Sequence, residues 1–290
     1  TPQAMLVSLT FKFGKQGGED NEMTQELCSK HDADKSLVKG TKRTICKEAF
    51  DPLKKIMNEF RGAVGRITIP WDMRGMSFCK PAAVAKVVAA RDLYGPLFNG
   101  SKENHLLGQY ETWKEMTKAK LGNAWKEDEF PTREDLAANV YFKMAIMPLP
   151  ESEALRKIKD IDESLMAELI KSNDARIQAG VKQGMVTAYT RLMEPLQHMV
   201  DVLTDDSPKI HESLVENVRK VVDEIPSLNL TDDPALAQFA GKVNEMLATL
   251  NADDLRQKNK EFKVVRRQVA QDAANLLATF GQVGIRRFNQ

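Results

Sequence analysis

Residues 69–81 read Ile-Pro-Trp-Asp-Met-Arg-Gly-Met-Ser-Phe-Cys-Lys-Pro and separate two helical patterns. Pro70 favours extended backbone just before it, and Gly75 permits a turn that most side chains resist. Pro81 suits the first turn of a new helix. We therefore predict an ordered, structural loop that holds the flanking helices. Its residues are Pro70, Trp71, Asp72, Arg74 and Gly75.

Helical patterns lie on both sides of this loop. Asp51 and Pro52 are typical of a helix start, and apolar residues at helical spacing continue from there towards Gly65. A second pattern follows Pro81. We expect that helix to stop at Gly95-Pro96, because a proline inside a helix removes a hydrogen-bond donor and crowds the preceding turn.

A strand is predicted near the N-terminus, because apolar residues alternate from Met5 to Phe13. Residues 140–147 also read as extended, and pairing between the two runs would form a small sheet. Residues 14–42 are either a loop with one short helix near residues 22–30 or a mobile excursion. A capping pair, Thr132 and Asp135, precedes the second extended run.

Pro148-Leu149-Pro150 is the predicted domain boundary. It divides the chain into an N-terminal α+β domain, residues 1–150, and a C-terminal helical domain, residues 151–290. The second domain opens with a helical pattern from Glu151 to about Val202, in which we expect a break at Pro195. The predicted fold class is mainly α: a helical bundle with a small N-terminal α+β portion that contains a short sheet.

Three further helix starts follow, at Ser207-Pro208, Asp233-Pro234 and Asp253-Asp254. Each precedes an amphipathic run that would contribute one seam to the bundle. The predicted seam of the last helix consists of Leu255, Phe262, Val265, Val269, Leu276 and Phe280.

The composition is that of an ordinary folded protein. The 290 residues are 42% hydrophobic and 29% charged, with a formal net charge of +1, so an electrostatic partner must be met by a local patch. Three widely spaced cysteines argue against a disulfide framework. With no signal-like or membrane-spanning run, the sequence predicts a cytoplasmic protein without membrane contact.

Signatures of catalysis are missing. The common phosphate-loop, dinucleotide, metalloprotease and hydrolase motifs do not occur. Of the four histidines, only His198 and His211 could meet, and a surface position explains them more simply than a metal site, which needs three or four converging ligands. We therefore predict a protein that is not an enzyme and that has no cofactor and no metal.

The end of the chain carries the strongest local charge. Glu261 and Asp272 are the only acids after Leu255, and this basic surplus could contact phosphates or could cover an exposed helix face beside acidic neighbours. The candidate nucleic-acid-binding residues are Arg256, Lys258, Lys260, Lys263, Arg266, Arg267, Arg286 and Arg287. Aromatic residues that could stack on bases or form core are Tyr110, Trp113, Trp125 and Phe130.

Several short runs together resemble one family. They are Thr68-Ile69-Pro70-Trp71-Asp72 with Gly75 and Pro81, Leu121-Gly122, Phe130-Pro131-Thr132, Pro148-Leu149-Pro150, Leu214-Val215-Glu216-Asn217-Val218, Pro226-Ser227-Leu228-Asn229-Leu230, Asp233-Pro234 and Leu255-Arg256. The chain after about residue 40 resembles a family of uncharacterised proteins of tailed bacteriophages. The resemblance implies a viral origin and a role in the cytoplasm of the host cell, and it implies no mechanism.

These observations lead to one functional expectation and two alternatives. We expect a non-enzymatic, phage-encoded binding protein that contacts DNA, in particular single-stranded DNA, or the host machinery acting on it. A structural or assembly protein that forms homo-oligomers is the first alternative. An inhibitor of a host defence enzyme is the second, with a host protein as its partner.

Overall fold

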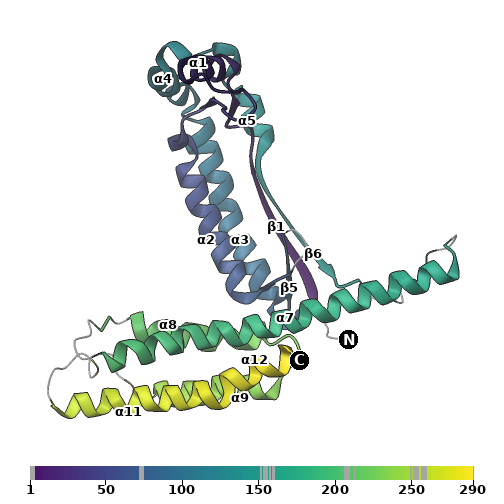
Figure 1. The fold of residues 1–290 in the computed structure, drawn as a ribbon, viewed down its shortest axis with the longest axis vertical. Coiled ribbons are helices and arrows are strands. Elements are labelled where there is room, and N and C mark those ends of the chain that lie inside the picture. Colours follow the sequence, from purple (N-terminus) through teal and green to yellow (C-terminus); the bar gives the residue numbers. More distant parts are fainter. Residues whose placement is uncertain are drawn as a thin grey trace. The chain divides into compact units, whose positions relative to one another are not determined.

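The structure is a computed structural model that describes residues 4–71, 75–150, 152, 156, 158, 161–205, 210–211, 213–248, 250, 255 and 260–289. It is mainly helical, and its N-terminal half contributes a small four-stranded antiparallel sheet (Figure 1). The predicted fold class is confirmed. In the described part of the chain, no helix combines the length and apolar character that crossing a membrane requires.

The strands are β1 (Met5–Phe13), β2 (Gly17–Glu19), β3 (Thr41–Arg43), β4 (Ile69–Pro70), β5 (Met76–Cys79) and β6 (Val140–Pro148). The α-helices are α1 (Asn21–His31), α2 (Asp51–Ile67), α3 (Val84–Ser101), α4 (Tyr110–Leu121), α5 (Arg133–Asn139), α7 (Glu163–Thr204), α8 (Ser213–Leu228), α9 (Pro234–Ala248), α11 (Lys260–Leu276) and α12 (Gln282–Asn289). Short 3-10 segments occupy Lys47–Phe50, Pro81–Ala83, Gly122–Ala124 and Glu127–Glu129. Leu277–Gly281, between α11 and α12, is a π-helical turn.

The chain forms two compact units. The first contains Thr1–Ser8, Val64–Val87 and Ala145–Gln290, and the second contains Leu9–Ala63 and Val88–Met144. A division at residue 150 assigns residues 4–8, 64–71 and 75–87 to the N-terminal domain, whereas in the structure these residues group with the C-terminal helices. Four elements, β1, α2, α3 and β6, therefore have residues in both units.

The four-stranded sheet has the order β4-β5-β1-β6. The neighbouring positions of β1 and β6 confirm the predicted pairing of the two extended runs. The stretch predicted as a loop contributes two short strands of this sheet, with Leu6 and Ile69 both opposite Phe78. Gly75 has a φ of 72°, and the Trp71 N–H donates to the Met76 carbonyl over 3.0 Å.

Two helix ends predicted at prolines are wrong. α3 continues through Pro96, and α7 continues through Pro195 as one helix of 42 residues. Proline removes only one hydrogen bond from a helix, whereas Leu192 and Leu196 beside Pro195 are fully buried in the bundle. Packing over several turns therefore outweighs the local cost, in line with the general dependence of helices on tertiary contacts.

The core of the first unit lies between the C-terminal part of α7 and helices α8, α9, α11 and α12 (Figure 1). The predicted helix start at Asp233-Pro234 is confirmed, because the Asp233 carboxylate accepts the Ala235 N–H over 3.1 Å at the start of α9. The seam prediction for the last helix is wrong at Val265, which is 39% exposed. The starts predicted at Ser207-Pro208 and Asp253-Asp254 fall outside the described residues.

Aromatic side chains dominate the core of the second unit. Phe11 of β1 contacts Phe60 of α2, Phe98 of α3 and Phe142 of β6, with ring centroids 5.5–5.9 Å apart. The predicted Thr132 cap is confirmed as a reciprocal pair, in which Thr132 Oγ1 accepts the Asp135 N–H and Asp135 Oδ2 accepts the Thr132 N–H. α1 confirms the expected short helix near residues 22–30.

Candidate nucleic-acid interface

Four of the eight candidate basic residues have described side chains that are exposed: Lys263, Arg267, Arg286 and Arg287. Lys263 and Arg267 lie four residues apart on α11, and helical spacing places them on one face. Arg286 is exposed on α12. Arg256 and Lys258 fall outside the described residues, and of Lys260 the structure describes only its place at the start of α11. Among the described candidates, Lys263 and Arg267 are therefore the pair that shares one exposed face of α11.

Arg266 lies in the interior. It is only 8% exposed, and its Nε donates to the carbonyl of Leu255 over 2.6 Å. The side chain thus satisfies a backbone acceptor at Leu255, which is itself fully buried. This position explains the error at Val265: the helix turns the neighbouring arginine inward and leaves the valine at the surface.

Arg287 contacts a buried acid. It pairs with Asp233, whose carboxylate also accepts the hydroxyl of Tyr189 over 2.8 Å. Burial raises the pKa of Asp233, but hydrogen bonds from Arg287, Tyr189 and the Ala235 N–H outweigh that effect and leave the pKa below its usual value. Burial, followed by the bond to Asp233, raises the pKa of Tyr189. Arg287 therefore joins α12 to the start of α9 and to α7.

Of the predicted structural loop, Trp71 lies in the core of the first unit. Trp71 is buried, and its ring lies 4.9 Å from that of Phe78, with the guanidinium of Arg176 over it at 5.6 Å. A side chain at Gly180 of α7 would lie 2.4 Å from Trp71 Nε1, so the indole requires a glycine there. Pro70 is exposed, and Asp72 and Arg74 fall outside the described residues. Among described groups, Trp71 Nε1 has no hydrogen-bond partner.

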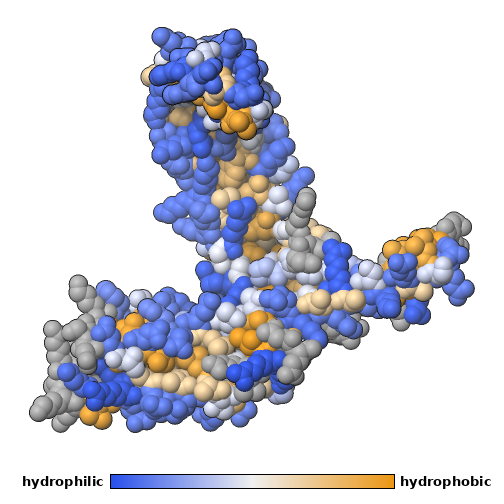
Figure 2. Space-filling view, viewed as in Figure 1, coloured by the Kyte–Doolittle hydropathy of each residue, from blue (hydrophilic) through white to orange (hydrophobic). Residues whose placement is uncertain are grey.

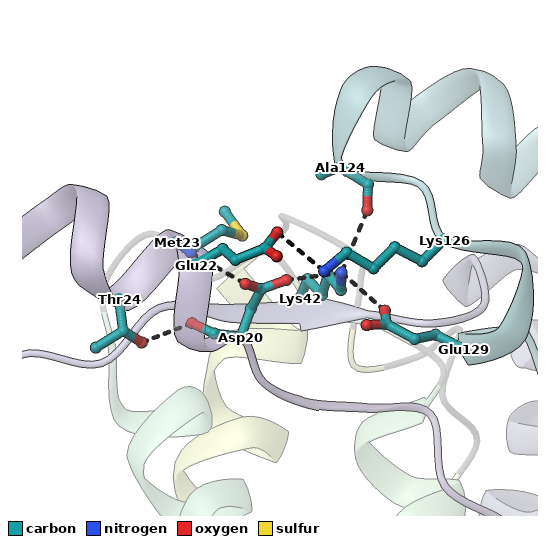
Figure 3. Close-up of polar contacts among 8 residues, drawn as sticks. All are labelled: Asp20, Glu22, Met23, Thr24, Lys42, Ala124, Lys126 and Glu129. Carbon is teal, nitrogen blue, oxygen red and sulfur yellow. Dashed lines mark hydrogen bonds and ion pairs between the residues drawn. The ribbon is translucent and has the colours of Figure 1, made fainter.

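Sequence reasoning did not find the most enclosed ion pairs, which lie in the second unit. Lys42 of β3 contacts Asp20 Oδ2 and Glu129 Oε2, each over 2.7 Å, and donates to the carbonyl of Ala124 over 3.2 Å (Figure 3). The hydrogen bonds to Asp20 and Glu129 raise the pKa of Lys42, and the bond from Lys42 lowers the pKa of Asp20. Lys42 is thus held as a cation.

The same contacts assign a structural role to this cluster. All three ammonium donors of Lys42 are used, and Asp20 also accepts the Met23 N–H over 3.0 Å as the N-cap of α1. A cavity of about 650 Å³ lies beside it and is lined by side chains of both signs, among them Lys12, Lys15 and Asp128. Its mixed charge indicates no particular ligand. In the sequence, the acidic run 127–129 indicated that these residues could contact a basic group. No feature of the run identified Lys42 as that group.

The aromatic residues considered for base stacking pack within the second unit. Trp113 is buried and its indole N–H donates to the His105 carbonyl over 2.9 Å. Phe130 is buried between the rings of Tyr110 and Trp125. His198 and His211 are exposed, and no cluster of three or more potential metal ligands occurs among the described residues.

Comparison with known proteins gives no relative: no family model, no curated protein and no solved structure matches this chain. Functional inference therefore depends on the geometry of the chain itself.

Proposed function

We propose that the protein is a non-enzymatic DNA-binding protein, and that Lys263 and Arg267 on α11 form its central contact. The observation that carries the proposal is the exposure of both side chains one helical turn apart. Residues 260–289 carry six basic side chains and only two acidic ones, in a chain of net charge +1. Such a basic helix face binds phosphate backbones through counterion release.

The proposal uses fewer residues than the sequence suggested. Arg266 and Arg287 contribute positive potential while they hold internal contacts, and Lys263, Arg267 and Arg286 remain as direct phosphate contacts. Three such contacts on a single strand correspond to a slope of about −2 in a plot of log affinity against log salt. The resemblance to phage proteins would place this binding in an infected bacterial cell, with single-stranded DNA as the first ligand to test.

A titration of labelled single-stranded DNA at two salt concentrations, followed by fluorescence anisotropy, tests the proposal. We expect binding at low salt that weakens on salt addition, and about a tenfold or greater loss of affinity in the double variant Lys263→Glu/Arg267→Glu. The matched control is Lys30→Glu/Lys35→Glu, which changes the net charge equally at exposed positions in and after α1.

Two results would overturn the proposal. One is an absence of binding at low salt, which would favour a protein partner such as the host machinery. The other is an equal loss of affinity in both double variants, because that would show an effect of total charge without a site on α11. A duplex of the same sequence serves as competitor and decides between single-stranded and double-stranded DNA.

A further inference from the structure

The N-terminal half of α7 is less covered by other parts of the chain than the rest of its unit. From Glu163 to Arg176 none of its residues is buried, and Leu165 and Leu169 are 50% and 44% exposed. In Figure 1 this half extends past the ends of α8, α9, α11 and α12, and in Figure 2 hydrophobic side chains gather on it. Ile158, which precedes the helix, is 51% exposed.

The two leucines belong to one continuous helix face. Leu165, Leu169, Ser172 and Arg176 are separated by four, three and four residues, the spacing of a coiled-coil seam. A different face of α7 contacts the chain that precedes it: Ser152 hydrogen bonds to Asp174, and Arg156 lines a hollow with Met166 and Ile170. The chain's own segment therefore contacts the face opposite the leucines.

We propose that the Leu165/Leu169 face of α7 docks onto the same face of a second copy of this chain, with the two helices antiparallel. The charges along the helix favour this partner and this direction. Of the charged residues beside this face, the acids Asp162 and Glu168 lie towards its N-terminal end, and the exposed Arg176 lies towards the other end. An antiparallel copy places opposite charges together at each end.

A parallel copy is disfavoured by the same charges. It would place Arg176 against Arg176 and Asp162 against Asp162 in the seam itself, and like charges in a seam are repulsive.

Two leucine layers bury little area, below the size of most stable interfaces, so the dimer is weak and depends on concentration. The inference is independent of DNA binding.

Analytical ultracentrifugation of the full chain, from low micromolar to submillimolar concentration, tests the proposal. We expect a reversible monomer–dimer equilibrium, and a dissociation constant raised about tenfold or more in Leu165→Gln/Leu169→Gln. Glutamine retains helix propensity, and both positions are exposed, so circular dichroism and Tm should match the unaltered protein.

The matched control is Leu93→Gln/Leu97→Gln, which removes a pair of leucines on α3 with the same spacing and similar exposure, 59% and 50%. The control should leave the dimer constant unchanged. A full chain that stays monomeric at all concentrations overturns the proposal, as does dimer loss in the α3 variant alone.

Disulfide cross-linking tests whether the two α7 helices are antiparallel. Leu165→Cys and Leu169→Cys chains, mixed under oxidising conditions, should cross-link to each other more efficiently than either does to itself. Efficient self-cross-linking of each variant would show parallel helices and overturn the antiparallel arrangement. Interference from the native thiols is low, because Cys28, Cys46 and Cys79 are all buried, and burial raises the pKa of Cys79 to about 11.

Discussion

The two halves of α7 have the same backbone and similar apolar spacing, yet they are covered differently. From Ile177 to Leu203 a buried residue recurs every three or four positions, packed against α8, α11 and α12. From Glu163 to Arg176 the apolar residues are half-buried or exposed. The comparison teaches that an apolar period specifies which face of a helix needs covering, whereas the surrounding fold decides whether the same chain covers it.

The largest expected effect comes from truncating one leucine in each half. Leu192→Ala should lower the free energy of unfolding by about 2–5 kcal/mol, because Leu192 is fully buried and its loss leaves a cavity. Leu169→Ala should change it by about 0.5 kcal/mol or less. Urea denaturation at low protein concentration measures both, and equal losses would contradict the described difference in packing.

A smaller effect is expected at a glycine of the buried half. Gly180→Ala should destabilise the protein by about 1–2 kcal/mol, because overpacking against the Trp71 indole exceeds the gain in helix propensity. The control is Gly241→Ala in α9, where an added Cβ meets nothing within 4 Å.

Gly241→Ala should instead raise stability by about 0.5–1 kcal/mol. Thermal unfolding of the two variants therefore gives shifts of opposite sign. A stabilising Gly180→Ala would mean that Trp71 does not pack on α7, and the structural role of the loop would fail.

The smallest expected effect concerns the polar contact of the buried half. Tyr189→Phe should cost about 1 kcal/mol at neutral pH, because it removes the hydroxyl that donates to the Asp233 carboxylate. Tyr141→Phe on β6, far from Asp233 in the sequence, serves as control. The measurement is urea denaturation at neutral and at acid pH.

The pH dependence has a definite sign. The folded-state pKa of Asp233 is lowered, so its stabilising contribution is present above the ordinary aspartate pKa of about 4 and is lost as pH falls through the lowered value. Tyr189→Phe brings that pKa closer to the ordinary one. The variant should therefore lose less stability on acidification than the unaltered protein, and an unchanged loss would contradict the coupling.

The candidate interface shows what a count of basic residues in the sequence can predict and what it cannot. The sequence correctly located a basic surplus, because composition is a property of the chain. It did not distinguish Arg266, which turns inward to the Leu255 carbonyl, from Arg267, which is exposed. Adjacent residues on a helix point about 100° apart, so an error of one position in the seam exchanges a core residue for a surface one.

The sequence by itself determined the features that depend on neighbours along the chain. Alternation predicted β1 and β6, and capping chemistry predicted the Thr132 and Asp233 caps, because strand period and helix caps are set within a few residues. Only the tertiary structure decided the rest. Lys42 finds Asp20 and Glu129 from distant segments, and α7 passes Pro195 because packing elsewhere outweighs the lost bond. Whether a side chain is buried depends on residues that are distant in the sequence, and a local sequence pattern does not identify them.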